Sequence, residues 1–547
     1  MRASDLDPAT PVLVGVGQYA ESIDDPGYEA LSAADLAGRA AAQALTDTGA
    51  EIAAVAAAID TVAGVRQFEI SGPGIEVTLG AADNFPRAVT GRIGADPAHA
   101  ILEVAGGQAP QSLVTEMAGD IAAGRREVVL LAGAEAISTA RHFEGRDDRP
   151  DFSETVGGQL DDRGAGLRGL VSWHTVTHGL IGAPVQYAML ENARRARLGL
   201  SRAAYDEQMG DLFAPFTRVA AANPLAAAPT ERTSAELVTP SERNRPIVDP
   251  YPRFVVARDQ VNQGAAVLLM SVAAARRLGV AEDRWVFLHG HADLHSAELV
   301  ERDDLSRYPV AELAVRHALE VADVELDDVD FLDLYSCFPV AVSVVLDALD
   351  LAADDPRGLT LTGGLPFFGG SGNNYSMHAI AEAVQRCRAH PDELGLVGAN
   401  GGTMSKYSVG LYSARPVGWR PDRSAELQAE VDAWPTTPYT HTPEGWATIE
   451  TYSVRFLPDD RRAGTVVGRL EATGERFLAK TSGADTEMLD LLAGPDPVGQ
   501  RAYVRAFDDA NRVTTSQERM DATRPRPPAG PDRSETDRQA AEFDALL

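Results

Sequence analysis

Residues 106–138 read GGQAPQSLVTEMAGDIAAGRREVVLLAGAEAIS, and this stretch decides the fold. It opens with a glycine-rich turn, continues through a helical segment from Gln108 to Gly124, and ends in an apolar strand over residues 127–135. Residues 370–402 repeat this order as GSGNNYSMHAIAEAVQRCRAHPDELGLVGANGG. Both stretches therefore predict a turn, a helix and a buried strand.

The spacing within the two stretches indicates a duplication. Gly107 and Ala134 are 27 positions apart, and so are Gly372 and Ala399. Self-similarity of this kind usually reflects repeated structural units, although two β-α-β units of similar length can also match by chance. The glycine-rich turns favour the first interpretation, so we predict a core of two related halves.

The segments around the first stretch alternate between strands and helices. Residues 11–20, 59–67 and 98–106 are apolar runs typical of strands, and residues 28–49 form an alanine-rich helical pattern that ends at a glycine. Such β-α-β alternation is typical of parallel sheets. The fold class predicted from the sequence is therefore α/β.

The chain divides into four predicted parts. Residues 1–275 form the first half of the core and residues 276–420 the second, and the first half loses its rhythm over about 140–255, which predicts an inserted cap or loop region. Residues 421–513 alternate in the manner of strands and predict an additional β-rich, barrel-like domain. Residues 514–547 begin with a stretch rich in Arg, Asp, Thr and Pro and predict a flexible tail.

Composition excludes several classes of protein. The 547-residue chain has a formal net charge of -31, which repels nucleic acid and anionic membrane surfaces. No apolar run reaches the roughly 18 residues of a transmembrane helix, and the polar start lacks a signal-peptide pattern. The two cysteines, Cys337 and Cys387, have no metal-type spacing. We therefore expect a cytoplasmic protein with free thiols and no nucleic-acid or membrane partner.

Over residues 10–415 the order and spacing of the motifs resemble those of thiolases, particularly the sterol-carrier-protein-type branch. The motifs are IAAGRREVVLLAGAEAIS, QVNQGAA, YSCF and a GG-x4-GG segment. The β-rich region that follows resembles the extra domain of actinobacterial thiolase-like type 1 proteins. The resemblance implies a thiolase fold, which is a duplicated five-layered αβαβα core with an inserted region, followed here by an appended C-terminal domain.

The residues that thiolases use for catalysis are missing. The family employs a nucleophilic cysteine, a histidine in a Gly-His-Pro loop and a second cysteine in a Cys-x-Gly loop. The matching positions are Gly107, Gly370 (or Ser371 with a one-residue slip) and Ala399. The chain therefore keeps an acyltransferase-type scaffold, as in acetyl-CoA acetyltransferases, but we expect no conventional covalent acyl transfer.

Four side chains are candidate substitutes for the lost groups. Cys337 and Tyr335 lie in the YSCF loop, where the thiol could act as nucleophile or base and the phenol could polarise a carbonyl. Cys337 could equally be a packed apolar residue. His378 follows the lost histidine position by eight residues and is either a substitute base or a structural residue on a helix face. Asn374 either donates hydrogen bonds to a ligand or stabilises a turn.

Backbone N–H groups can form an oxyanion hole even where the cysteine side chains are missing. In thiolases the N–H groups at the positions of Gly107 and Gly401 form an oxyanion hole, so these two could still polarise a thioester carbonyl. Asn373 and Asn400, which stand beside the lost histidine and second cysteine, have the same two interpretations as Asn374.

The resemblance implies coenzyme A or an acyl-CoA as the ligand, with no covalently bound cofactor. The DQVNQGAA turn matches the family's pantetheine-side loop and places Asp259 and Asn262 at the ligand. Arg253 and Arg258 flank this turn and either meet phosphates or balance neighbouring carboxylates. No metal site is expected, because the pair His174 and His178 lacks an evident third ligand.

Three functions remain open from the sequence. The first is an enzyme of lipid metabolism that cleaves a carbon–carbon bond of a β-oxygenated acyl-CoA by noncovalent activation. The second is a non-catalytic acyl-CoA carrier, regulator or partner subunit. The third places the function in the appended domain, which could bind a partner protein. We expect a monomer or a dimer, since the appended domain could block the usual thiolase interface.

Overall fold

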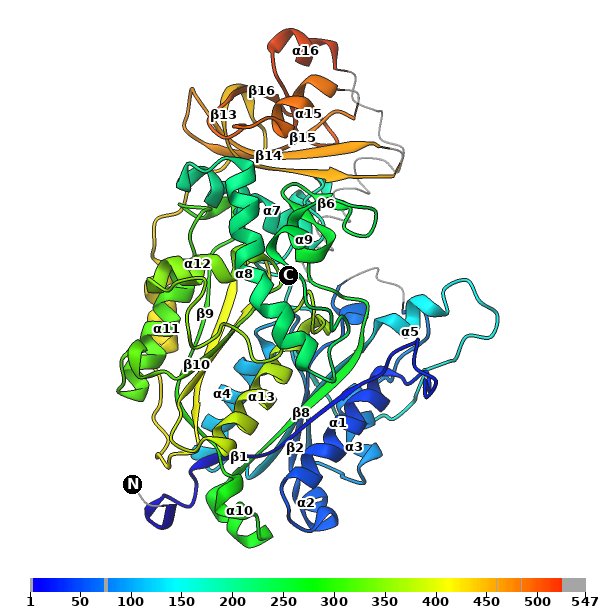
Figure 1. The fold of residues 1–547 in the computed structure, drawn as a ribbon, viewed down its shortest axis with the longest axis vertical. Helices are drawn as coiled ribbons and strands as arrows, with labels where there is room; N and C mark the ends of the chain where they lie inside the picture. The colour runs from blue at the N-terminus through cyan, green and yellow to red at the C-terminus, as the bar shows by residue number, and fades with distance from the viewer. Residues whose placement is uncertain (1–2, 73–76, 459, 484, 524–547) are drawn as a thin grey trace.

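The computed structural model describes residues 3–72, 77–458, 460–483 and 485–523. Two bodies are stacked along the long axis of the molecule (Figure 1). The larger is an α/β core that begins near the N-terminus, and the smaller is a β-rich domain at the opposite end.

The first sheet of the core is mixed. Its strands lie in the order β1, β8, β4, β2, β3 and β5. They span Pro11–Ala20, Asn262–Ser271, Val128–Ala136, Thr61–Gly64, His99–Leu102 and Asp161–Asp162. β2 is parallel to β3 and β4, whereas β8 is antiparallel to β4 and to β1. The expected common direction holds for β1, β2, β3 and β4. β8 runs opposite to them, because Ala136 pairs with Asn262 and the chain re-enters the sheet at the end where the insertion left it.

The second sheet is smaller and matches part of the first. Its order is β10, β11, β12 and β9, with bounds Phe331–Leu334, Gly395–Gly401, Lys406–Ser413 and Phe287–His295. β10 and β11 are parallel, and the other two pairs are antiparallel, as in the series β2, β4, β8 and β1. A bridge between Leu13 and Val286 joins the edge strands of the two sheets.

Helices separate and cover the two sheets. α4 (Ala109–Ala122) and α13 (Tyr375–Ala389) lie side by side in the centre and contact strands of both sheets (Figure 1). α1 (Ala33–Asp47) covers the outer face of the first sheet and α11 (Pro309–Ala322) that of the second. The five layers and the paired units α4–β4 and α13–β11 confirm the predicted duplicated core.

Local chemistry sets where α1 begins. The alanine-rich pattern starts at residue 28, but the Ser32 hydroxyl accepts a hydrogen bond from the Asp35 N–H while the Asp35 carboxylate accepts one from the Ser32 N–H. This capping box fixes the first turn at Ala33. The smaller helices of the core outside the insertion are α2 (Ile52–Ala58), α3 (Phe85–Arg92), α10 (Val272–Leu278), α12 (Pro339–Leu349) and α14 (Ser424–Asp432).

The insertion forms a helical layer beneath the appended domain. Its helices are α5 (Ile137–His142), α6 (Trp173–Thr177), α7 (Ala183–Leu198), α8 (Arg202–Ala222) and α9 (Ser234–Val238). α7 packs on β13 of the appended domain, and the Asn192 side chain donates to the carbonyls of Asp249 and Tyr452. The insertion therefore joins the two bodies.

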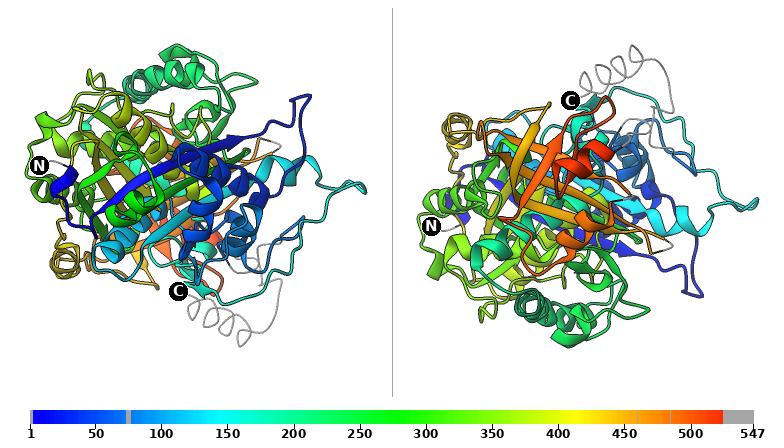
Figure 2. Two further views of the ribbon diagram at one scale, coloured as in Figure 1. Left: turned by 90° about the horizontal axis from the view of Figure 1, so that it is seen from below. Right: turned by 90° about the horizontal axis from the view of Figure 1, so that it is seen from above.

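The appended domain is the predicted barrel-like sheet. Five strands, β13 (Glu444–Phe456), β14 (Arg462–Leu470), β15 (Arg476–Thr481), β17 (Arg512–Thr514) and β16 (Arg501–Arg505), close into a ring because β14 also pairs with β13. The view from above shows them over the core (Figure 2). Two strands from the insertion, β6 (Pro246–Val248) and β7 (Tyr251–Pro252), extend this sheet, which the sequence did not predict.

The borders of this domain differ from a simple reading of the chain. α14 follows Pro421 yet packs on β9 of the core. The predicted flexible tail starts too early, since Thr514 ends β17 and residues 517–522 form α16 (Gln517–Ala522), with α15 (Thr486–Ala493) on the same domain. Arg519 anchors α16 through an ion pair of 2.6 Å with Asp485. The remainder of the predicted tail, from residue 524, lies outside the described residues.

Among the helices that the structure describes, none has both the length and the apolar character needed to cross a bilayer.

Candidate ligand-binding site

Tyr335 fills the space beside Gly107, the position that the sequence resemblance assigns to the thiolase nucleophile. A Cβ atom built on Gly107 would lie 2.2 Å from the Tyr335 hydroxyl oxygen. A cysteine at this position would therefore require the tyrosine to move. Tyr335 is buried, and burial raises the pKa of its phenol, so the group is a neutral hydrogen-bonding side chain.

Cys337 lies in the same buried cluster, and its thiol is protonated. Burial raises the pKa of its thiol to about 12, because no bulk water stabilises the thiolate. Its neighbours are Tyr187 and Asn400, and the Asn400 amide donates to the Tyr187 hydroxyl at 2.7 Å while that hydroxyl donates to the Gly402 carbonyl at 2.8 Å. The thiolate needed for nucleophilic attack is therefore scarce near neutral pH.

His378 points to a different part of the core. Its Nδ1 lies 2.8 Å from Oε1 of Gln18 in β1, and its ring packs edge-on against Phe368. Burial lowers the pKa of His378 to about 3, so the imidazole is neutral. These contacts do not bring the ring to Tyr335 or Cys337.

The loop before α13 clamps the loop before α4. The side-chain oxygen Oδ1 of Asn373 accepts from the Gly106 N–H at 2.9 Å, and the Ser376 hydroxyl donates to the Gly107 carbonyl at 2.6 Å. The Asn374 amide donates to the Gly133 carbonyl at 2.7 Å. These side chains hold the two glycine-rich turns together.

A side-chain oxygen lies beside the two glycines, Gly107 and Gly401, that were expected to form an oxyanion hole. Gly107 and Gly401 do lie together, with the Gly107 nitrogen 3.2 Å from a Cβ built on Gly401. The Gln108 side-chain oxygen is closer still, at 1.8 Å from that Cβ, and it is buried without a hydrogen-bond partner among the described residues. A ligand donor could satisfy this oxygen.

Several other buried polar atoms around these loops lack a partner within the described part of the chain. They are Ser371 Oγ, Asn374 Oδ1, His378 Nε2, Asn400 Oδ1, Thr403 Oγ1 and Ser405 Oγ. Leaving such a group unsatisfied costs about 1–3 kcal/mol, so native proteins normally supply water or a ligand. Water or a ligand at the duplicated loops would satisfy these atoms.

Beside these loops lies an open pocket of about 160 Å³ with three arginines in its wall. Arg232, Arg253 and Arg258 form no ion pair with any residue that the structure describes, and Arg232 lies over the Phe254 ring at 4.0 Å. Burial, followed by the positive charges of Arg253 and Arg232, lowers the pKa of Arg258. The Asp259 carboxylate opposes this shift, so the pocket carries an excess of positive charge on a strongly acidic protein.

The arginine pocket adjoins the clamped loops. The Gly370 N–H donates to the Arg258 carbonyl at 2.8 Å, and the Ala257 N–H donates to the Cys337 carbonyl at 3.0 Å. Asp259 also lines the pocket, but its carboxylate pairs with Arg141 at 2.7 Å.

The remaining candidates have contacts elsewhere. Asn262 does not line the pocket, and its side chain accepts from the Thr139 N–H at 3.0 Å. His178 uses both ring nitrogens, on the His174 carbonyl and the Asn511 N–H. Within the described ranges no set of three His, Cys, Asp or Glu residues is arranged to hold a metal ion.

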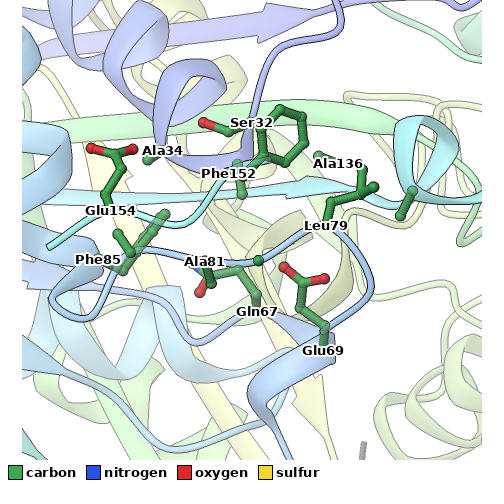
Figure 3. A pocket seen from close by; sticks show the side chains of 14 residues that line it. Ser32, Ala34, Gln67, Glu69, Leu79, Ala81, Phe85, Ala136, Phe152 and Glu154 are labelled. Carbon is green, nitrogen blue, oxygen red and sulfur yellow. The ribbon is translucent and has the colours of Figure 1, made fainter. Parts of the chain in front are cut away.

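A second pocket has the opposite charge. It lies between the start of α1, the end of β4 and residues 79–85 and 152–154, and Figure 3 shows the Glu69 and Glu154 carboxylates on its wall. Glu154 pairs with Arg92, while burial raises the pKa of Glu69. An acidic wall disfavours phosphate groups, so the arginine pocket is the better candidate for a nucleotide-like ligand.

Sequence reasoning missed three residues of the site. Arg232 comes from the insertion, Tyr187 from α7, and Gln108 directly follows the lost nucleophile position. Gln108 could have been predicted from the sequence, since it adjoins Gly107. The other two carry no motif that distinguishes them from surrounding helix and loop residues.

Comparison with known proteins agrees with the geometry. A family model described as the thiolase-like protein type 1 additional C-terminal domain matches residues 426–509. The crystal structure of a monomeric SCP2-thiolase like protein type 1 from Mycobacterium smegmatis is 50% identical, covers 93% of this chain and 100% of its own, and superposes with a TM-score of 0.80.

More distant structures share the fold of the core. An Ltp2-ChsH2(DUF35) aldolase is 19% identical over 75% of this chain and 99% of its own, with a TM-score of 0.54. Human mitochondrial 3-ketoacyl-CoA thiolase is 17% identical over 75% of this chain and 100% of its own, with a TM-score of 0.51. A search of the curated proteins found no match.

Proposed function

Because the chain belongs to the SCP2-thiolase-like proteins of type 1, we propose that it binds a coenzyme A ester without thiolysing it. The observation that carries this proposal is the group of three unpaired arginines beside the duplicated loops. A reactive cysteine is missing from the nucleophile position, yet the surface that would meet the ligand is charged and open.

The charge of the pocket fits the charge of the ligand. Coenzyme A carries a diphosphate and a 3′-phosphate, and guanidinium groups bind phosphate oxygens through paired hydrogen bonds. The protein as a whole is acidic, with a net charge of -31, so a phosphate-bearing ligand needs a local site of positive charge. That positive charge comes from three arginines, Arg232, Arg253 and Arg258.

The acyl end of the ligand would reach the clamped loops. Ala257 and Arg258 hydrogen-bond to the backbone of Cys337 and Gly370, so the wall of the pocket is attached directly to the clamped loops. The unpartnered oxygens of Gln108 and Asn400 offer acceptors for the amide N–H groups of a pantetheine arm.

Tyr335 favours a second candidate, carbon–carbon cleavage of a β-hydroxyacyl-CoA. Its phenol stands at the nucleophile position and could protonate the carbon released as an enolate. The reaction also needs a base for the β-hydroxyl proton. The Cys337 thiol has a pKa of about 12 and His378 contacts Gln18 instead, so neither supplies that base, and binding is the better-supported function.

Calorimetric titration tests the binding proposal. Wild-type protein and the double variant R253A/R258A are titrated with coenzyme A and acetyl-CoA, and R501A serves as a control because Arg501 is an exposed arginine paired with Glu471. Loss of two charge-assisted contacts should weaken binding more than tenfold, while R501A should match the wild type. Equal affinity of all three proteins, or no binding by the wild type, would refute the proposal.

A further inference from the structure

Arg302 is a buried cation that forms no ion pair with a carboxylate of the described residues. Its side chain is 8% exposed, and its Nε donates to the Ala297 carbonyl at 3.0 Å. Its Nη2 is buried and has no hydrogen-bond acceptor among the described residues, and no described carboxylate lies within ion-pair distance. Arginine stays protonated even when burial lowers its pKa. An unpaired charge inside a protein is costly, which points to an anion that the fold leaves to a ligand.

Glu298 is the carboxylate that acts electrostatically on Arg302, and it does so from beyond ion-pair distance. Electrostatic interactions also connect Arg302 to Tyr308 and Tyr187. The Glu298 carboxylate accepts from the Gly169 N–H at 2.7 Å, which keeps it on a neighbouring loop. The Tyr308 hydroxyl is buried and has no partner in the described part of the chain, so it is available as a donor next to the guanidinium.

Arg302 also lies close to the candidate site. Tyr187, with which it interacts, contacts Cys337 and accepts the hydrogen bond from Asn400. One residue therefore separates the guanidinium from the loops that would hold the thioester. This position is on the acyl side of the ligand, whereas the three pocket arginines are on the phosphate side.

The appended domain fixes the segment that carries Arg302. Arg476 of β15 is 1% exposed and donates to the carbonyls of Val300, Arg302 and Asp303. The Thr437 N–H donates to the Glu301 carbonyl at 2.8 Å. Glu450 holds the Arg476 guanidinium through an ion pair of 2.6 Å. The appended domain thereby sets the position of a buried cation in the core.

We propose that Arg302 binds a carboxylate on the acyl group of the ligand, so that the protein prefers carboxyacyl-CoA esters to simple acyl-CoA esters. This inference rests on the proposed binding of coenzyme A esters. A carboxylate accepts two hydrogen bonds from a guanidinium in one plane, and the Tyr308 hydroxyl adds a third donor.

Matched ligand pairs test the inference by calorimetry. Glutaryl-CoA is compared with valeryl-CoA and adipoyl-CoA with hexanoyl-CoA, because each pair has the same carbon count and differs in the terminal carboxylate. The wild type should bind the carboxylated member at least tenfold more tightly in one of the pairs. R302Q should remove this preference and keep the affinity for valeryl-CoA, whereas R277Q, which changes an exposed arginine paired with Glu127, should retain it.

The outcomes separate this inference from the proposed function. Equal wild-type affinity within both pairs, or a preference that survives in R302Q, overturns the role of Arg302 and leaves coenzyme A binding intact. No wild-type binding of any ester overturns both. If R302Q fails to fold, as judged by its thermal unfolding, R302K replaces it and should lose most of the preference, because lysine cannot form the paired contact of a guanidinium with a carboxylate. A full preference in R302K would overturn the role of the guanidinium.

Discussion

The nucleophile region and the arginine pocket differ in space and in charge. Around Gly107 the space for a reactive side chain is filled by Tyr335, and the nearby Cys337 thiol is protonated and buried. The arginine pocket remains open and carries three unpaired cations. The difference teaches that the recognition of a ligand and the reaction on it are separable parts of this fold, because they use different segments of the chain.

The largest expected effect concerns the packing of Tyr335 on Gly107. Tyr335→Ala should destabilise the protein by about 3–5 kcal/mol through the cavity it leaves. Gly107→Ala should cost about 1–3 kcal/mol by overpacking against the Tyr335 ring. In the double variant the new methyl group enters the vacated space, so the total should be smaller than the sum. Urea unfolding of the four proteins measures this coupling, and additivity within about 0.5 kcal/mol would show that Tyr335 does not fill the nucleophile position.

The neutral interior should also make stability sensitive to acid. The pKa of His378 is about 3 in the folded protein and about 6.5 when unfolded, so between these values the unfolded chain binds the extra proton. Stability from this residue is therefore present above pH 6.5 and decreases as the pH falls, by about 2 kcal/mol at pH 5. Unfolding at pH 7.5 and 5.0 should show a smaller acid loss in His378→Gln than in the wild type. His390→Gln, at an exposed side chain, is the control, and identical losses in all three proteins would exclude a buried neutral His378.

The arginine pocket should respond to salt where the interior does not. Mobile ions screen exposed charges, so the wild-type affinity for coenzyme A should fall more than tenfold between 50 and 500 mM NaCl, to a first approximation. The double variant R253Q/R258Q should bind more weakly at low salt and lose much less affinity over this range. Calorimetry at several salt concentrations measures both slopes. Parallel slopes would assign the phosphates to a different surface.

The smallest expected effect is the slow reaction of the two buried thiols with a labelling reagent. Cys337 and Cys387 are both buried, and burial raises the pKa of each thiol to about 12. Neither should react with a chromogenic disulfide reagent at pH 8 within minutes, whereas both should react after unfolding in guanidinium. Rapid labelling of native protein at Cys337, identified by mass spectrometry, would reopen its role as a nucleophile.

Much of the site could be predicted where its residues share one short segment. Arg253, Arg258 and Asp259 flank a single turn, and the structure places all three in one pocket wall. Asn262 belongs to the same motif, but it is already inside β8, where strand geometry directs it to Thr139. The alternative that the arginines balance carboxylates stays open for Arg258, because Asp259 acts on it electrostatically although the Asp259 carboxylate forms its ion pair with Arg141.

Residues from distant segments escaped prediction for a physical reason. Arg232, Tyr187 and Arg302 reach the site only after the insertion and the loop before α11 have packed on the core. Nothing in their local sequence distinguishes them from arginines and tyrosines on other helices and loops. The same reason hides the joining of β6 and β7 to the appended sheet, since an edge pairing between residues 248 and 455 depends on how two bodies meet.

The sequence by itself determined the duplicated core, the appended barrel-like domain and the loss of the thiolase nucleophile. Periodicity and turn residues encode the first two features within segments of some 30 residues, where the chain's local preferences agree with the fold. The third is what the resemblance to thiolases implies. Only the tertiary structure decided that Tyr335 fills the vacated space, that His378 turns to Gln18, and that Arg302 is buried without an ion pair among the described residues. Those outcomes depend on close packing between segments hundreds of residues apart, which local pattern cannot specify.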